Sequence, residues 1–227
     1  MNFSKNNPIA IVDSGIGGVS VLKQLIAKFG GGNYIYYADN LYMPYGNKSK
    51  IEINKRVDYI INLLKTKYKV ESVIIACNTA STSIDSSKYK NVYTMQFNKK
   101  YTYYATNLTK NNLKNIRVIA DTNLPNLIEK YIFNKSTLEK LIKQRINTHQ
   151  LKTYKEIVLG CTHYELISNT FKKFAKNTNF INNSSFVLKD INMEEQTELN
   201  IHLLTSKNDN KFNEKFYKLL NWPLLFS

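Results

Sequence analysis

The sequence IAIVDSGIGGVSVLKQLIAKFGGGNYIYY, residues 9–37, carries the clearest pattern of strands and helices in the chain. It predicts a buried strand at Ile9–Val12, a loop at Asp13–Gly18, a helix at Ser20–Phe29 that ends at three glycines, and a second strand at Tyr34–Tyr37. Two short apolar strands joined by an amphipathic helix are typical of a parallel pair with a helix packed on one face.

The same alternation continues along the rest of the chain. Further strands are predicted at 72–76, 92–95, 116–120, 157–159, 179–181 and 200–204, and helices at 49–64, 125–133, 137–147, 165–175 and 209–220. Ser49 with Glu52, and Ser136 with Glu139, have the Ser-x-x-Glu spacing of a capping box. Strands separated by helices imply parallel sheets covered on both faces, so the fold class is α/β.

The composition is strongly basic. The 227 residues include 32 Lys and Arg against 17 Asp and Glu, which gives a formal charge of +15. Only Arg56, Arg117 and Arg145 are arginines, and the lysines are spread over every segment. A dedicated nucleic-acid binder would show arginine forks and stacked aromatics, so nucleic acid is not expected as the main partner.

Neither a membrane segment nor a secretory signal is visible. The longest apolar runs, such as Val73–Cys77, are far shorter than the roughly 20 residues that span a bilayer. The N-terminus lacks the long apolar core of a signal peptide, so we expect a cytoplasmic protein. In that reducing compartment Cys77 and Cys161 would be free thiols, either small buried hydrophobes or reactive groups.

The two cysteines lie in segments that are weakly similar to each other. VIIACNTAS (73–81) and IVLGCTHYE (157–165) both contain an apolar strand, a cysteine at its carboxyl end, a threonine within two positions and a following helix. Ligands of α/β proteins bind at the carboxyl ends of strands. Either cysteine alone would be interpreted as core packing, but the repeated arrangement favours function for the pair.

Two opposed thiols suit proton transfer at carbon, which needs a base on one face and an acid on the other. A helix N-terminus after each cysteine predicts a lowered thiol pKa. Asp13 and His163 are candidates to hold or accept a proton beside one thiol each, although His163 could also be a core residue. A Cys/His hydrolase would leave the second cysteine without a role. Zinc is not expected, because the cysteines and histidines lack ligand spacing.

The loop DSGIGG, residues 13–18, resembles a phosphate-cradling turn, because its glycines let backbone N–H groups approach an anion. The Rossmann spacing and the Walker lysine are both absent, so a nucleotide is not expected. A carboxylate ligand suits the same geometry. Further neutral or backbone donors are Ser14, Tyr45, Gly46, Asn78, Thr79 and Thr162, although PYG (44–46) alone could be only a turn.

Taken in order, DSGIGG (13–18), YADNLYMPYGNKS (37–49), ACNTAS (76–81) and LGCTHY (159–164) resemble the cofactor-independent glutamate racemases of the aspartate/glutamate racemase superfamily. The resemblance implies two similar domains with mostly parallel sheets flanked by helices, and an active site in the cleft between them. It also implies a small-molecule substrate, glutamate, the supply of D-glutamate for peptidoglycan, and no cofactor or metal. A homodimer is left open.

Carried over by motif, the resemblance makes Cys77 and Cys161 the two acid/base thiols, with Asp13 assisting near Cys77 and His163 near Cys161. It places seven residues around the substrate: Ser14, Pro44, Tyr45, Gly46, Asn78, Thr79 and Thr162. It implies a first domain of residues 1–92 with 191–227, and a shortened second domain of residues 93–190. A His after GCT favours glutamate over aspartate.

The chain also departs from the family pattern. Gln96-Phe97 replaces a usual Glu-Pro pair, and Asn183-Ser184 stands where Asp-Ser is frequent. The family's Pro-rich segment, with a glutamate that assists the histidine, has no evident counterpart, and we do not assign that role to Glu139. Two alternatives therefore stay open: a racemase or isomerase of the same fold for aspartate or another dicarboxylate, and a degenerate, non-catalytic binding protein.

Overall fold

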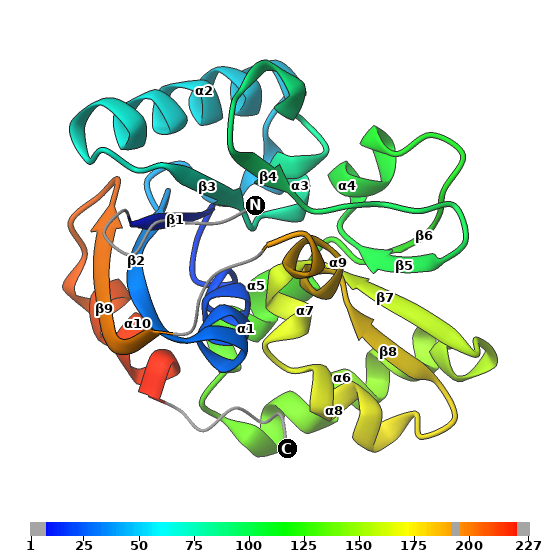
Figure 1. Ribbon diagram of the computed structural model, residues 1–227. Helices are drawn as coiled ribbons and strands as arrows, with labels where there is room; N and C mark the ends of the chain where they lie inside the picture. Colours follow the sequence, from blue (N-terminus) through cyan, green and yellow to red (C-terminus); the bar gives the residue numbers. More distant parts are fainter. Residues whose placement is uncertain (1–7, 192–195, 222–227) are drawn as a thin grey trace.

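The computed structural model describes residues 8–191 and 196–221 and contains two sheets whose strand pairs are all parallel (Figure 1). The first sheet has the order β4 (Val92–Thr94), β3 (Ser72–Ile75), β1 (Ile9–Asp13), β2 (Gly30–Ala38) and β9 (Gln196–Thr205). The second has the order β6 (Arg117–Ala120), β5 (Thr102–Ala105), β7 (Glu156–Gly160) and β8 (Asn179–Asn182). The predicted α/β class is therefore confirmed.

Helices cover both faces of the first sheet. Helix α2 (Lys50–Lys67) lies on one face, and α1 (Val19–Phe29) and α10 (Asn210–Asn221) lie on the other (Figure 1). Alternate residues of β1 point to opposite sides, with Ile9 and Ile11 in the core of α1 and Ala10 and Val12 in the core of α2.

Helix α2 follows the predicted pattern closely. Ser49 and Glu52 form the predicted capping box, in which the Ser49 side chain accepts from the Glu52 N–H and Glu52 accepts from the Ser49 N–H. Five apolar residues spaced at three and four positions form its buried stripe: Ile53, Val57, Ile60, Ile61 and Leu64.

The helices of the second sheet, apart from α6, are shorter than α1, α2 and α10. They are α4 (Asn107–Asn112), α5 (Leu124–Tyr131), α6 (Lys135–Thr148), α7 (Thr162–Glu165), α8 (Ser168–Phe174) and α9 (Ser184–Lys189), while α3 (Asn78–Ser81) belongs to the first sheet. One apolar core joins α1 and α10 with α5, α6, α7 and α8. Helix α1 thus lies between the two sheets and shares one apolar core with residues of both (Figure 1).

Several predicted elements need correction. The sequence pattern missed β5 and α4, because alternating threonines and tyrosines hide the buried pair Tyr103 and Tyr104. The single helix predicted at 165–175 is divided into α7 and α8. The second capping box is wrong, because Asn134 caps α6 by accepting from the Thr137 N–H over 3.1 Å.

The predicted division into residues 1–92 with 191–227 and residues 93–190 stays a prediction. Its last segment includes residues 192–195 and 222–227, which lie outside the described part of the chain. Among the helices that the structure describes, none is both long and apolar enough to cross a membrane.

Candidate active site

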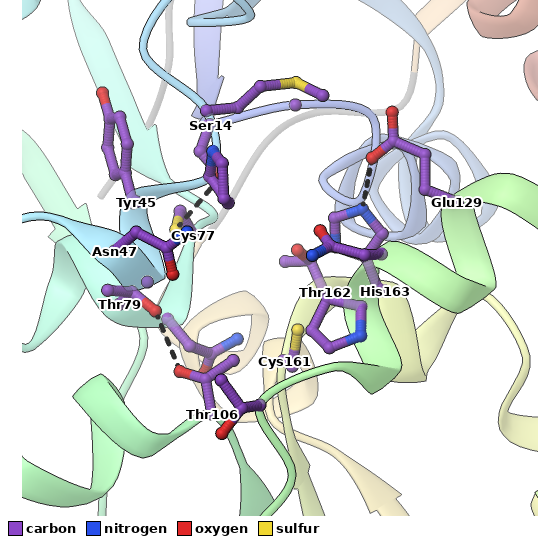
Figure 2. Close-up of a pocket in the computed structure, with 18 of the residues that line it drawn as sticks. Ser14, Tyr45, Asn47, Cys77, Thr79, Thr106, Glu129, Cys161, Thr162 and His163 are labelled. Carbon is purple, nitrogen blue, oxygen red and sulfur yellow. Dashed lines mark hydrogen bonds and ion pairs between the residues drawn. The ribbon is translucent and has the colours of Figure 1, made fainter.

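An open pocket of about 750 Å³, a volume that includes solvent at its mouth, lies where strands of both sheets end (Figure 2). Ser14 follows β1 and Cys77 follows β3, whereas Thr106 follows β5 and Cys161 follows β7. Ten of the eleven predicted site residues line it: Ser14, Pro44, Tyr45, Gly46, Cys77, Asn78, Thr79, Cys161, Thr162 and His163. The two sheets therefore bring together side chains that are far apart in the sequence.

Cys77 is a buried free thiol at the start of α3. It donates a hydrogen bond to Oγ of Ser14 over 3.7 Å (Figure 2). Burial, followed by repulsion from the Asp13 carboxylate, raises the pKa of Cys77 to about 12. The lowered pKa expected from a helix N-terminus is thus wrong for this thiol, because α3 has only four residues and desolvation outweighs its dipole.

Cys161 is a buried free thiol at the start of α7, on the other side of the pocket (Figure 2). His163 follows two positions later, and its Nε2 lies 3.1 Å from Oε2 of Glu129. Burial opposes a charged imidazole, but hydrogen bonds and charge attraction from Cys161 and Glu129 raise the pKa of His163 well above 6.5. Despite burial, the contact with His163 lowers the pKa of Glu129. The surroundings of Cys161 therefore favour an ion pair between a protonated His163 and an ionised Glu129.

Glu129 is the carboxylate of the pocket that the sequence reasoning missed. It lies on α5, four positions after Pro125, and both residues line the pocket. Glu139 pairs instead with Lys173 on the surface, at 2.8 Å. The sequence does contain a pattern that could have identified Glu129. A proline and then a glutamate lie on a short helix that follows a strand, and from there a carboxylate can face the end of a neighbouring strand.

Asp13 is buried and does not line the pocket. Its Oδ1 accepts from the Gly15 N–H over 2.9 Å, and its Oδ2 accepts from the Thr162 hydroxyl over 3.1 Å. Burial raises its pKa, although the charge of His163 acts in the opposite direction. Asp13 thus links the first sheet to the residue that follows Cys161.

The glycine loop has a different role from the one expected. The Gly15 N–H, predicted to face an anion, is used by Asp13. A Cβ on Gly17 would lie 2.3 Å from Oγ1 of Thr162 and 2.7 Å from Nδ1 of His163. The glycine at position 17 therefore lets the start of α1 approach α7 closely.

The segment Pro44–Asn47 forms one wall of the pocket. The Tyr45 hydroxyl donates to Oδ2 of Asp39 over 2.6 Å, and Arg56 pairs with both oxygens of Asp39 at 2.7 and 2.9 Å. Asp39 is fully buried, so this network fixes the wall against α2.

Asn78 and Thr79 form the wall beside Cys77. Oδ1 of Asn78 accepts from Nδ2 of Asn183 over 2.6 Å, whereas Nδ2 of Asn78 is buried and has no partner among the described residues. The Thr79 hydroxyl meets those of Thr106 and Thr109 at 3.3 and 3.2 Å. Five further polar lining residues were not predicted: Asn47, Thr106, Asn107, Thr122 and Asn126.

Within the described residues, no three His, Cys, Asp or Glu side chains are arranged to hold a metal ion. His149 contacts Asp121, and His202 lies on β9, so neither joins the pocket. The neutral and charged donors around the two thiols can instead bind a small anionic molecule directly.

No protein-family model matches the chain. The chain is 35% identical over 193 residues to a glutamate racemase of Thermoanaerobacter sp. (strain X514), with 73% of this chain and 72% of the relative covered. It is 27% identical over 253 residues to a glutamate racemase of Clostridium acetobutylicum, with 96% and 98% covered.

Two solved structures share the fold. Glutamate racemase from Thermus thermophilus, in complex with β-chloro-D-alanine, has a TM-score of 0.81 at 18% identity and covers 96% of this chain and 94% of its own. Glutamate racemase from Francisella tularensis, in complex with D-glutamate, has a TM-score of 0.74 at 22% identity and covers 97% and 96%.

Proposed function

We propose that this chain, which belongs to the glutamate racemase family, interconverts L- and D-glutamate by two-base proton transfer at the α-carbon without a cofactor. One observation carries the proposal: Cys77 and Cys161 line the same pocket from different sheets. A substrate between them would present opposite faces of its α-carbon to the two thiols, as inversion requires.

The two thiols start from different protonation states in this mechanism. Cys161 acts as the thiolate, paired with the His163 imidazolium, and removes the α-proton of one enantiomer. Cys77, a protonated thiol, donates its proton to the opposite face of the carbanion. Cys161 then holds a proton and Cys77 has lost one, so the reverse reaction uses the same groups with their roles exchanged.

Polar groups around the thiols bind the substrate. The unpartnered Nδ2 of Asn78 supplies an N–H donor beside Cys77. The wall at Pro44, Tyr45 and Gly46 supplies the backbone N–H groups of Tyr45 and Gly46, and Ser14 and Thr79 supply hydroxyl groups. Thr162 donates its O–H to Asp13, so its oxygen can accept from the substrate ammonium group. Each hydrogen bond to a charged carboxylate contributes on the order of 1.5–3 kcal/mol.

The product has a clear use in this proposal: D-glutamate made in the cytoplasm serves peptidoglycan synthesis. The chain's likeness to named glutamate racemases supports glutamate as the substrate.

The test is circular dichroism of the purified protein with L-glutamate, and then with L-aspartate, without added cofactor. We expect the signal of L-glutamate to decay to zero, and the decay to persist after chelation and after hydroxylamine treatment. Decay with L-aspartate alone would show that the substrate is a dicarboxylate other than glutamate. No decay with either substrate would indicate a binding protein, and activity restored by pyridoxal phosphate or zinc would refute the cofactor-free mechanism.

A further inference from the structure

Asp121 lies directly after β6, behind the pocket, and does not line it. Its side chain is only 6% exposed, yet it is surrounded by donors. Oδ1 accepts from the backbone N–H groups of Asn123 and Leu124, at 3.2 and 3.1 Å. These contacts fix the first turn of α5, whose own N-cap side chain makes no capping hydrogen bond.

The second oxygen of Asp121 connects two further elements. Oδ2 accepts from the Tyr104 hydroxyl of β5 over 2.9 Å. It also lies 3.0 Å from Nε of Arg145 on α6 and 3.2 Å from Nε2 of His149, the C-cap residue of that helix. A buried carboxylate with this many donors resists displacement, because any movement would leave a charge unpaired.

The backbone of Asp121 holds α7. Its carbonyl accepts from the Tyr164 hydroxyl over 3.0 Å, and the Tyr164 ring lies 4.9 Å from that of Tyr104, centroid to centroid. Tyr164 is the residue after His163. Asp121 therefore fixes both the helix that carries Glu129 and the helix that carries His163.

We propose that Asp121 is a positioning residue for the reaction, because it holds α5 and α7 in the register that brings Glu129 to His163. This inference rests on the proposed function. The side-chain and carbonyl contacts of Asp121 described above all lie on the second sheet and the helices of that sheet. Asp121 therefore acts on the Cys161 side of the pocket and leaves the Cys77 side unchanged.

A one-base reaction separates the two sides. Elimination of HCl from 3-chloroglutamate needs one thiolate to take the α-proton while chloride leaves. The enamine that results tautomerises, and water converts it to 2-oxoglutarate and ammonia. The D and L enantiomers, of the same relative configuration, present the α-proton to different thiols. Cys77→Ser and Cys161→Ser should therefore each abolish elimination from one enantiomer, and not from the same one.

The deciding variant is Asp121→Asn, which removes the charge and turns an N–H group toward Arg145 or His149. We expect about a 10- to 100-fold lower kcat for the enantiomer that depends on Cys161, because a shift on the order of 1 Å between reacting groups has this effect. The KM and the reaction of the other enantiomer should stay within about twofold. Glu139→Gln is the matched control, because it removes a surface ion pair elsewhere on α6.

Arg145→Gln provides a milder second variant that keeps the carboxylate and its hydrogen bonds, and it decides the question if Asp121→Asn does not fold in thermal denaturation. It should show a smaller loss for the same enantiomer. Equal losses for both enantiomers, or no loss in either variant, would overturn the positioning role. Wild-type protein that neither racemises glutamate nor eliminates chloride would instead refute the proposed function itself.

Discussion

Cys77 and Cys161 occupy matching places in the two sheets. Each residue is the N-cap of a four-residue helix, α3 or α7, that directly follows a buried parallel strand, and each has an extended backbone. Their neighbours differ. Cys77 contacts the neutral Ser14, with the Asp13 carboxylate nearby, whereas Cys161 has His163 and Glu129 beside it.

The difference continues along the two helices. Two positions after the cysteine, α3 has Thr79 in a cluster of three hydroxyl groups, and α7 has His163 in an ion pair. Four positions after it, α3 has Ser81 and α7 has the fully buried Glu165. The matching backbone therefore surrounds the two thiols with different charged groups, and the side chains of each helix and its neighbours account for the difference.

The strongest test of this comparison removes one thiol at a time. Cys77→Ser and Cys161→Ser should each lower racemisation by about 10²- to 10⁴-fold, because a serine hydroxyl is a much weaker acid and base at neutral pH. The measurement is circular dichroism, together with deuterium uptake from heavy water. Near wild-type turnover in either variant would contradict the two-thiol mechanism.

The second test uses the ionisable residue that α3 lacks. Burial raises the pKa of Glu165 from 4.5 to about 7, while Ser184, Ser20 and Gln24 surround its carboxyl group. The folded state therefore keeps a proton that the unfolded chain releases near 4.5. The stabilisation that protonated Glu165 adds to the free energy of unfolding is complete below pH 4.5 and is lost as the pH rises through about 7.

Glu165→Gln should remove this dependence. Between pH 4.5 and 8 the wild-type free energy of unfolding should fall by about 3 kcal/mol more than that of the variant, because the pKa of Glu165 is about 7 in the folded state and 4.5 in the unfolded chain. Urea denaturation at several pH values measures it. Ser81→Ala, at the matching position, should lower stability equally at every pH. Parallel pH curves for wild type and Glu165→Gln would contradict the assignment.

The third test targets the ion pair beside Cys161. Glu129→Gln should lower the pKa of His163, because the carboxylate stabilises the imidazolium. The proposed mechanism needs the His163 imidazolium beside Cys161, so activity should fall as the pH rises through the pKa of His163. The variant should therefore lose activity at a lower pH than the wild type. We expect about a tenfold or greater loss of turnover at neutral pH.

The ionisable groups that face this pair are Cys161 and Asp13 around His163, and Lys215 of α10 beside Glu129. The pH profile of the elimination assigned to Cys77 should keep its shape in Glu129→Gln, and Glu139→Gln should leave both profiles unchanged. A shift of both profiles by Glu129→Gln would show that the two sides of the pocket are not independent.

Local patterns predicted much of this molecule. Strand ends and helix starts place Cys77 and Cys161 correctly, and the α2 stripe follows from its spacing. What failed depends on tertiary packing: β5 is hidden by threonines, Glu129 reaches His163 from 34 positions away, and Gly15 serves Asp13. The pKa of Cys77 also failed, because desolvation is set by neighbours that one sequence window does not contain.

The smallest expected effect concerns the basic surface, which both halves share. Raising salt from about 0.05 to 0.5 M should lower kcat/KM for glutamate only several-fold, because lysines more than about 10 Å from the pocket are screened, while hydrogen bonds inside it are screened much less. Thr162→Val should cost more, about tenfold, because it removes the hydroxyl group that Asp13 accepts from. Steady-state kinetics over a salt series compares the two. A salt effect larger than that of Thr162→Val would mean that the lysine-rich surface, and not the pocket, recognises the substrate.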